Sequence, residues 1–226
     1  KNVLCTIESL FGQMIPAAKF PRIVSYLPMA HIAARAGDHY QAIYRIGQIF
    51  PVPVLEDMRD ALPTIKPSVF LAVPRVWEKF KAGLEARIEE NPKKDLIAKA
   101  IQNGLEKVDY EQKGESVPFM VGLKDKIFAK LVFSKFKEGL GIVDTEYFVT
   151  AAAPMNKDVH RWFHAIGIDV TEIYGMTEDT GPATIGVPGN AVESFEKRLK
   201  VDSIKVPSVL NPIGKVGIPI PGTEVK

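Results

Sequence analysis

The 226-residue sequence predicts an α/β protein with a mixed, mainly parallel sheet flanked by helices. The nearly continuous apolar run at 68–73 is typical of a strand buried on both faces. The segment 75–140 carries apolar residues at three- and four-residue spacing, as amphipathic helices do. A strand, a helix and a second strand follow over 146–173, which indicates parallel pairing through a right-handed crossover.

The first quarter of the chain mixes short apolar runs with proline and glycine. Ile23–Leu27 is predicted as a strand that ends at Pro28. Ser68–Val73 is predicted as a second strand before Pro74, with a short buried helix as the alternative.

The segment from Arg75 to about Leu140 is predicted to be helical. Pro92 and the stretch 114–118 divide it into three helices, the third over Leu123–Lys137. The apolar positions that set the spacing are Trp77, Phe80, Leu84, Ile88, Leu96, Ile97, Ala100, Ile101 and Leu105.

The next segment has the clearest pattern of strand and helix. Residues 146–151 form a predicted strand, and Asn156 is a good N-cap for a helix over 158–166. Gly167 ends that helix, and a second strand runs over 168–173. Ligands of parallel sheets bind beyond the carboxyl ends of the strands, so the loops after these two strands are the candidate site.

The last part of the chain is rich in proline and glycine after Gly181. It contains an exposed charged patch over 193–200 and closes with turns and short strands over 214–225.

Composition excludes several classes of protein. Hydrophobic residues make up 46% and charged residues 25%, which is typical of a globular chain. The net charge of +2 argues against a strongly basic nucleic-acid binder. The single cysteine, Cys5, cannot form an internal disulfide, so a reducing compartment such as the cytoplasm is expected. No apolar stretch approaches the roughly 20 residues of a membrane-spanning helix.

The loop 174–178, Tyr-Gly-Met-Thr-Glu, places an aromatic ring, a glycine, a hydroxyl and a carboxylate at one predicted strand end. The ring of Tyr174 can stack on a flat base, and the Thr177 hydroxyl can donate to a phosphate. The Glu178 carboxylate can hold Mg²⁺, which binds one or two carboxylates together with substrate phosphates. Taken alone, an ordinary strand-to-loop turn is the alternative.

Five segments together, in this order along the chain, resemble the AMP-forming adenylate synthetases, the acyl-CoA synthetase and luciferase superfamily. They look most like the long-chain fatty acid CoA ligases, and the resemblance covers essentially the whole chain. The segments that carry it are 26–35 (Tyr-Leu-Pro-Met-Ala-His-Ile-Ala-Ala-Arg), 72–80, 151–154 (Ala-Ala-Ala-Pro), 174–181 and 214–222.

The resemblance implies the large N-terminal domain of an adenylate-forming enzyme, with ATP, Mg²⁺ and coenzyme A as its cofactors and co-substrates. A fatty acid would be activated as an acyl-adenylate and transferred to coenzyme A. The implied nucleotide-binding residues are Ala152, Ala153, Pro154, Glu172, Ile173, Tyr174, Gly175, Met176 and Thr177. The family often has glycine where this chain has alanines, and alanine makes a left-handed backbone less favourable there.

The resemblance also implies catalytic roles for three residues. Thr177 matches the α-phosphate donor, and Glu178 matches the Mg²⁺ ligand. His31 matches a gate near the substrate carboxylate and the pantetheine entry, with a hydrogen-bonded loop histidine as the alternative. The barrier to the attack of the acid on ATP is largely electrostatic, because an anion approaches a polyanion. Positioned cations and hydrogen-bond donors are therefore expected to catalyse this step.

Three parts of the family pattern are absent. The phosphate loop would precede Lys1, and the ribose-binding aspartate and the C-terminal lid with its lysine would follow Lys226. Residues 1–226 are therefore expected to be an internal fragment of the adenylation domain, inactive as a ligase by itself.

Other signals are weaker. His160 and His164 lie four apart on one predicted helix, but no third metal ligand is evident nearby. Cys5 has no base partner that would make it a nucleophile. We keep open peripheral contact of 77–107 with a membrane surface, although its mixed charges argue against strong binding to anionic lipid. The competing functions are adenylation of another carboxylic acid and a non-catalytic acyl- or nucleotide-binding module.

Overall fold

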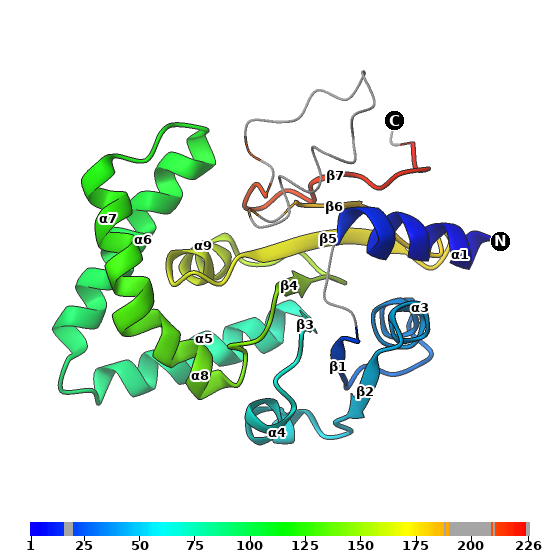
Figure 1. Ribbon diagram of the computed structural model, residues 1–226, viewed down its shortest axis with the longest axis horizontal. Coiled ribbons are helices and arrows are strands. Elements are labelled where there is room, and N and C mark those ends of the chain that lie inside the picture. The colour runs from blue at the N-terminus through cyan, green and yellow to red at the C-terminus, as the bar shows by residue number, and fades with distance from the viewer. Residues whose placement is uncertain (16–19, 188, 190–208, 210, 225–226) are drawn as a thin grey trace.

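The computed structural model describes residues 1–15, 20–187, 189, 209 and 211–224. Its described strands form one sheet in the order β2-β1-β3-β4-β5-β6-β7 (Figure 1). The pairs from β2 to β5 are parallel, and β6 and β7 are added antiparallel. The predicted mixed, mainly parallel sheet is confirmed. The strands are β1 (Arg22–Ser25), β2 (Gln48–Pro51), β3 (Val69–Ala72), β4 (Tyr147–Thr150), β5 (Val170–Met176), β6 (Gly181–Ile185) and β7 (Ile218–Pro219).

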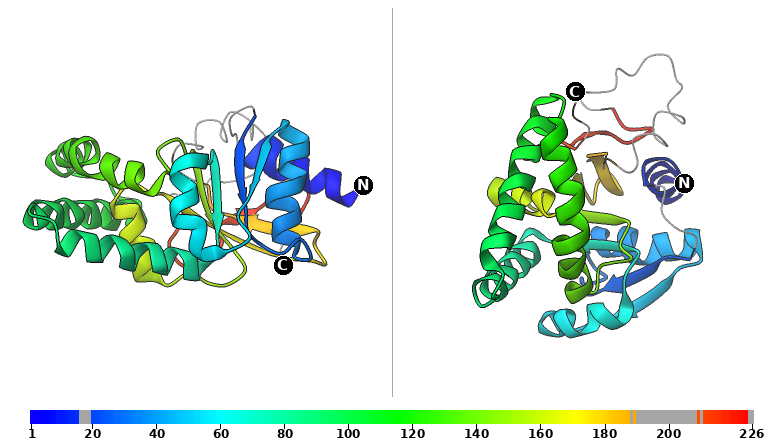
Figure 2. Two further views of the ribbon diagram at one scale, coloured as in Figure 1. Left: turned by 90° about the horizontal axis from the view of Figure 1, so that it is seen from below. Right: turned by 60° about the vertical axis from the view of Figure 1, so that its left-hand side comes forward.

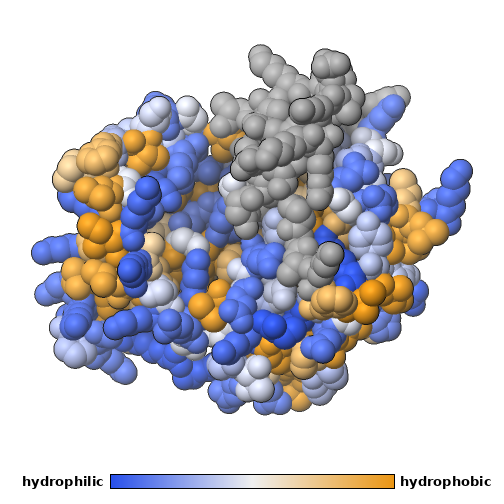
Figure 3. All heavy atoms as spheres, in the orientation of Figure 1, coloured by the Kyte–Doolittle hydropathy of each residue, from blue (hydrophilic) through white to orange (hydrophobic). Residues whose placement is uncertain are grey.

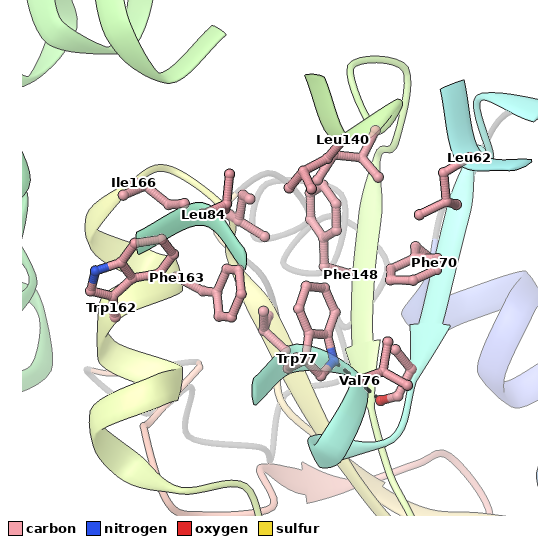
Figure 4. Packing of buried hydrophobic residues seen from close by; sticks show 14 of the residues in the cluster. Leu62, Phe70, Val76, Trp77, Leu84, Leu140, Phe148, Trp162, Phe163 and Ile166 are labelled. Carbon is pink, nitrogen blue, oxygen red and sulfur yellow. Dashed lines mark hydrogen bonds between the residues drawn. The ribbon is translucent and has the colours of Figure 1, made fainter. Parts of the chain in front are cut away.

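The first face of the sheet is covered by α4 (Met58–Ile65), α5 (Pro74–Glu89), α8 (Ser134–Leu140) and α9 (Lys157–Ala165). Trp77 is fully buried at the centre of this layer, between Phe70, Phe148 and Phe163 (Figure 4). Its indole N–H donates to the Ala72 carbonyl at 3.1 Å, so the ring fixes α5 to the end of β3.

The second face is covered by the amino-terminal helices. Leu10, Phe11 and Met14 pack against Val69 and Tyr147 of the sheet. Two segments of wider, π-type turns, η1 and η2, take part in this layer. Its elements are α1 (Asn2–Ile7), η1 (Glu8–Met14), α2 (Ile32–Ala34), η2 (Arg35–Tyr40) and α3 (Gln41–Arg45), and the short η3 (Leu55–Asp57) precedes α4.

The helical segment at 75–140 forms a group beside the sheet (Figure 2). It contains α5, α6 (Lys94–Lys113), α7 (Phe119–Phe128), η4 (Ala129–Phe133) and α8. The predicted third helix, 123–137, is too short, because the helical path begins directly after Pro118 and continues to Gly141, where φ is +70°. The guanidinium of Arg161 on α9 donates to both oxygens of Asp109 on α6, which fixes this group to the core.

The strand–helix–strand unit over 146–173 is confirmed. The Asn156 side chain accepts from the N–H groups of Asp158 and Val159, and Gly167 ends the helix with φ of +75°. The prediction for 193–200 lies outside the described residues. No helix in the described ranges is long and apolar enough to span a bilayer.

Candidate active site

The carboxyl ends of β1, β3 and β4 meet at one edge of the sheet, as parallel pairing requires. A pocket of about 480 Å³ opens at this edge, and its lining is almost entirely apolar. We call it the edge pocket. It is lined by Leu27, Pro28, Ala30, His31, Ala33, Leu71, Ala72, Val73, Ala151 and Ala152.

A second hollow, the face cavity, lies between the second face of the sheet and the helical segments η1, α2 and η2. It shares part of its lining with the edge pocket, so the two hollows adjoin. The shared residues are His31, Ala33, Leu71, Ala151 and Ala152. The other residues that line the face cavity are Leu10, Phe11, Ile15, Ile32, Ala36, Gly37, Gln41, Val69, Val149, Ile173, Gly175, Gly181 and Pro182.

His31 lies where the two hollows adjoin, at the start of α2. Its Nδ1 accepts a hydrogen bond from the Ala33 N–H at 3.0 Å, so the side chain is the N-cap of the helix. An accepting Nδ1 places the proton of the neutral ring on Nε2, which is then the donor. His31 therefore caps the helix through Nδ1 and also lines both hollows.

The loop 151–154 follows β4 directly. Ala152 has φ of +75°, so the left-handed backbone that we expected alanine to disfavour is present. Ala152, Ala153 and Pro154 are exposed. The backbone of the loop is thus held in a conformation that costs an alanine energy, at the rim of both hollows.

Glu172 supports this loop through a hydrogen bond to the backbone. Its side chain is buried, and Oε1 accepts from the Met155 N–H at 3.1 Å. Desolvation by burial raises the pKa of the carboxyl above its ordinary value. The other oxygen, Oε2, has no hydrogen-bond partner among the described residues. Glu172 thus supports the loop through Met155, while the neighbouring Ile173 lines the face cavity.

The segment 174–176 differs from the predicted loop. Tyr174, Gly175 and Met176 belong to β5, which runs past the end of β4 and pairs there with β6. The register shifts between Tyr174 and Gly175. A Cβ at Gly175 would lie 2.1 Å from the Gly181 carbonyl oxygen, so only glycine fits this crossing. Tyr174 is 49% exposed, which leaves its ring accessible to a ligand.

Thr177 and Glu178 lie in the turn between β5 and β6. The Thr180 N–H donates to the Thr177 carbonyl at 3.0 Å and closes the turn. Both side chains are exposed. A single accessible carboxylate suits Mg²⁺ that arrives with a nucleotide, because the ion binds few protein ligands besides substrate phosphates. The described residues contain no group of three or more metal-ligating side chains that could hold an ion alone.

The structure brings some of the predicted residues to one place and leaves others at its rim. His31, Ala152, Ile173 and Gly175 line the face cavity. The predicted residues that line neither hollow and are exposed are Ala153, Pro154, Tyr174, Met176, Thr177 and Glu178. The apolar wall formed by Leu10 and Phe11 of η1 and by Ile15, which follows it, was not assigned from the sequence. The only signal for it was the spacing of apolar residues near the start of the chain.

The histidine pair has a structural role. His160 and His164 both place Nε2 on the Val170 carbonyl, at 2.7 Å and 3.0 Å. Burial lowers the pKa of His160 to about 4, so its ring is neutral at ordinary pH. The pair therefore joins α9 to β5.

The whole chain, residues 1–226, matches the family of AMP-binding enzymes. The chain therefore belongs to this family. The fold is that of the N-terminal domains of adenylate-forming enzymes. A benzoate CoA ligase from Burkholderia xenovorans matches 98% of this chain with a TM-score of 0.55 and 13% identity. MatB from Rhodopseudomonas palustris matches 98% with a TM-score of 0.53 and 17% identity, and these matches cover 32% and 30% of those chains.

Among curated proteins the chain is similar to fatty-acid–CoA ligases. It is 36% identical over 171 residues to fadD11 of Mycobacterium tuberculosis, which is named a fatty-acid–CoA ligase. It is 34% identical over 180 residues to the long-chain-fatty-acid–CoA ligase ACSBG2 of Rattus norvegicus. These matches cover 74% and 75% of this chain, but only 30% and 26% of the two relatives.

Proposed function

We propose that the protein containing this chain is an ATP-dependent and Mg²⁺-dependent ligase that joins a long-chain fatty acid to coenzyme A. The observation that carries the proposal is the apolar face cavity, whose lining includes His31, Ala152 and Gly175 at the carboxyl edge of the sheet. The similarity to fatty-acid–CoA ligases supports the same substrate class.

The proposed reaction has two steps. In the first, a carboxylate oxygen of the acid attacks the α-phosphorus of ATP, the bond to pyrophosphate breaks, and an acyl-adenylate forms. In the second, the coenzyme A thiol loses its proton and its sulfur attacks the acyl carbonyl, so that a thioester forms and AMP leaves. Both steps move negative charge, so hydrogen-bond donors placed at the charge are the expected devices.

We assign the nucleotide to the rim formed by the loop 151–154 and the second half of β5. The Tyr174 ring would stack on adenine, because the residue is half exposed and accessible to a ligand. The Thr177 hydroxyl would donate to the α-phosphate. Glu178 would hold Mg²⁺, which would neutralise phosphate charge when bound with ATP. His31 would donate through Nε2 to the substrate carboxylate.

The acyl chain is assigned to the face cavity, of about 70 Å³, together with the adjoining edge pocket of about 480 Å³. The walls of the face cavity come from Leu10, Phe11 and Ile15 on one side and from Val69, Leu71 and Val149 of the sheet on the other. An apolar lining favours a hydrocarbon over a polar acid, since transfer of each methylene from water is favourable by about 0.8 kcal/mol. The proposal therefore predicts that turnover depends on chain length.

The test is pyrophosphate release by the complete protein with ATP, Mg²⁺ and acids of increasing length. Release that requires a long-chain acid supports the proposal. Release only with another acid would mean that the substrate belongs to a different class of carboxylic acid. Nucleotide binding without any release would support a non-catalytic binding module.

Variants of the rim test the assignment of roles. Glu178→Ala should raise the Mg²⁺ concentration needed for half-maximal rate, whereas Asp179→Ala, in the same turn, should not. Tyr174→Ala should weaken nucleotide binding by about 1–3 kcal/mol if the ring stacks, and Tyr174→Phe should keep most of it. Unchanged kinetics in Glu178→Ala and Tyr174→Ala would show that this rim is not the nucleotide site.

A further inference from the structure

The outer face of α7 and η4 carries a row of exposed apolar side chains. Phe119 is 79% exposed, Met120 57% and Leu131 61%. Leu123 and Ile127 lie between them at 41% and 48%. Because positions three and four apart share one face of a helix, these five residues form one continuous stripe, which we call the α7 stripe. Figure 3 shows hydrophobic atoms gathered over this side of the molecule, where α6 and α7 lie.

The stripe is separate from the face that attaches the helix to the protein. Val121 and Val132 are buried on the opposite side, and the amide of Asn103 on α6 donates to the Val121 carbonyl at 3.2 Å. The helix is therefore anchored by its inner residues, and the stripe lies on its outer side. Apolar residues on both sides of a helix indicate a second partner for the outer side.

Within the span of the stripe, the exposed charged side chains are lysines. Lys124, Lys126, Lys130 and Lys135 are exposed along the same helical path. Two acidic residues lie on this path. Asp125 is turned toward α6, where it pairs with Lys107 at 3.0 Å, and the exposed Glu138 lies beyond the stripe on α8. The outward surface thus combines apolar side chains with lysines and without an outward carboxylate between 119 and 137.

We propose that the α7 stripe is a docking surface for an anionic lipid bilayer. A helix that lies in the bilayer interface buries its apolar face among the acyl chains and places its lysines at the anionic headgroups. A protein partner would have to provide both an apolar groove and a ring of acidic residues, whereas an anionic membrane provides both along its whole surface. The surface lies on the helical group beside the sheet and is separate from the nucleotide rim (Figure 2). It differs from the 77–107 region considered from the sequence, and it does not depend on the proposed ligase activity.

The test is flotation of the complete protein with two kinds of vesicle. One contains phosphatidylcholine alone, and the other also contains about 30% phosphatidylglycerol. The protein should float with the anionic vesicles and much less with the neutral ones, and added salt should weaken the binding. The triple variant Leu123→Gln, Ile127→Gln, Leu131→Gln should lower the partition coefficient by roughly tenfold or more. The matched control Leu4→Gln, Ile43→Gln, Val143→Gln removes exposed apolar side chains elsewhere and should bind as the parent does.

The lysines are tested separately. Lys126→Gln with Lys130→Gln should weaken binding to anionic vesicles by roughly 25-fold, since each lysine near such a surface contributes about fivefold. Lys66→Gln with Lys157→Gln serves as the control of equal charge. No flotation with anionic vesicles, or binding that the stripe variants leave unchanged, would overturn the proposal. If the triple variant instead converts a dimer to a monomer in sedimentation, the stripe is an interface between copies and the lipid proposal is wrong. Pyrophosphate release measured without vesicles tests the ligase proposal separately from the lipid proposal.

Discussion

The carboxyl group of Asp38 is expected to make the stability of this fold depend on pH. Asp38 lies on η2 and is 3% exposed. The Ser25 hydroxyl donates to it, but Oδ2 has no hydrogen-bond partner among the described residues. Desolvation by burial raises its pKa from 3.8 to about 6, although the Ser25 hydroxyl and His39 act in the opposite direction. An ionised carboxylate is thus held in a site that favours the neutral form.

The sign follows from proton binding. Between pH 4 and pH 6 the folded state keeps the Asp38 proton while the unfolded state has lost it, so stability falls as the pH rises. A shift of about two pKa units at 1.36 kcal/mol each gives a cost of about 3 kcal/mol, which is complete above pH 6. The cost is absent below about pH 4, where both states are protonated.

The variant Asp38→Asn removes the titration and retains an acceptor for Ser25. It should be more stable than the parent by up to about 3 kcal/mol at pH 7.5 and should differ little at pH 4. The measurement is denaturant unfolding from pH 4 to pH 8, followed by fluorescence of the buried Trp77 and Trp162. Asp60→Asn, which removes an exposed carboxylate, is the control. A difference between Asp38→Asn and parent that stays constant across this pH range would refute the reasoning.

Three further substitutions test the supports of the candidate site. Ala152→Gly should stabilise the protein by about 1 kcal/mol in thermal or denaturant unfolding, because glycine adopts the positive φ without strain. Gly175→Ala should destabilise it by about 1–3 kcal/mol and weaken nucleotide binding by calorimetry, because the new Cβ collides with the Gly181 carbonyl. Glu172→Ala should cost about 1–3 kcal/mol by leaving the Met155 N–H unpaired, while Glu172→Gln should restore most of that loss; equal effects of the two would contradict this role.

The strand–helix–strand unit could be predicted from the sequence because its information is local. Asn156 caps α9 through its own side chain, and Gly167 ends the same helix with a positive φ. Each of these depends on residues within a few positions of itself. The buried apolar run at 68–73 was equally readable, since a strand covered on both faces needs no alternation.

The path of β5 could not be predicted because its last residues depend on a distant partner. Residues 174–176 contain a glycine and follow the predicted strand at 168–173, which is typical of a loop. They are a strand because β6 supplies the hydrogen bonds that β4 no longer offers. Likewise, no local pattern assigns Leu10 and Phe11 to the wall of a cavity, because the opposite wall comes from β3 and β4.

The change from parallel to antiparallel pairing along β5 explains why the candidate site lies here. Up to Glu172 the strand is paired with β4, and this pairing fixes the loop after β4 beside it. Beyond Glu172 the strand pairs only with β6 among the described strands, so the edge that would face β4 is free to face a ligand. Gly175 permits the close crossing of β6, and the register shift beside it changes the direction of the residues that follow. An aromatic ring, a hydroxyl and a carboxylate are therefore presented by a hydrogen-bonded strand and a tight turn rather than by a mobile loop. Under the proposed function, this ordered backbone would present the three groups without the cost of ordering the chain during the reaction.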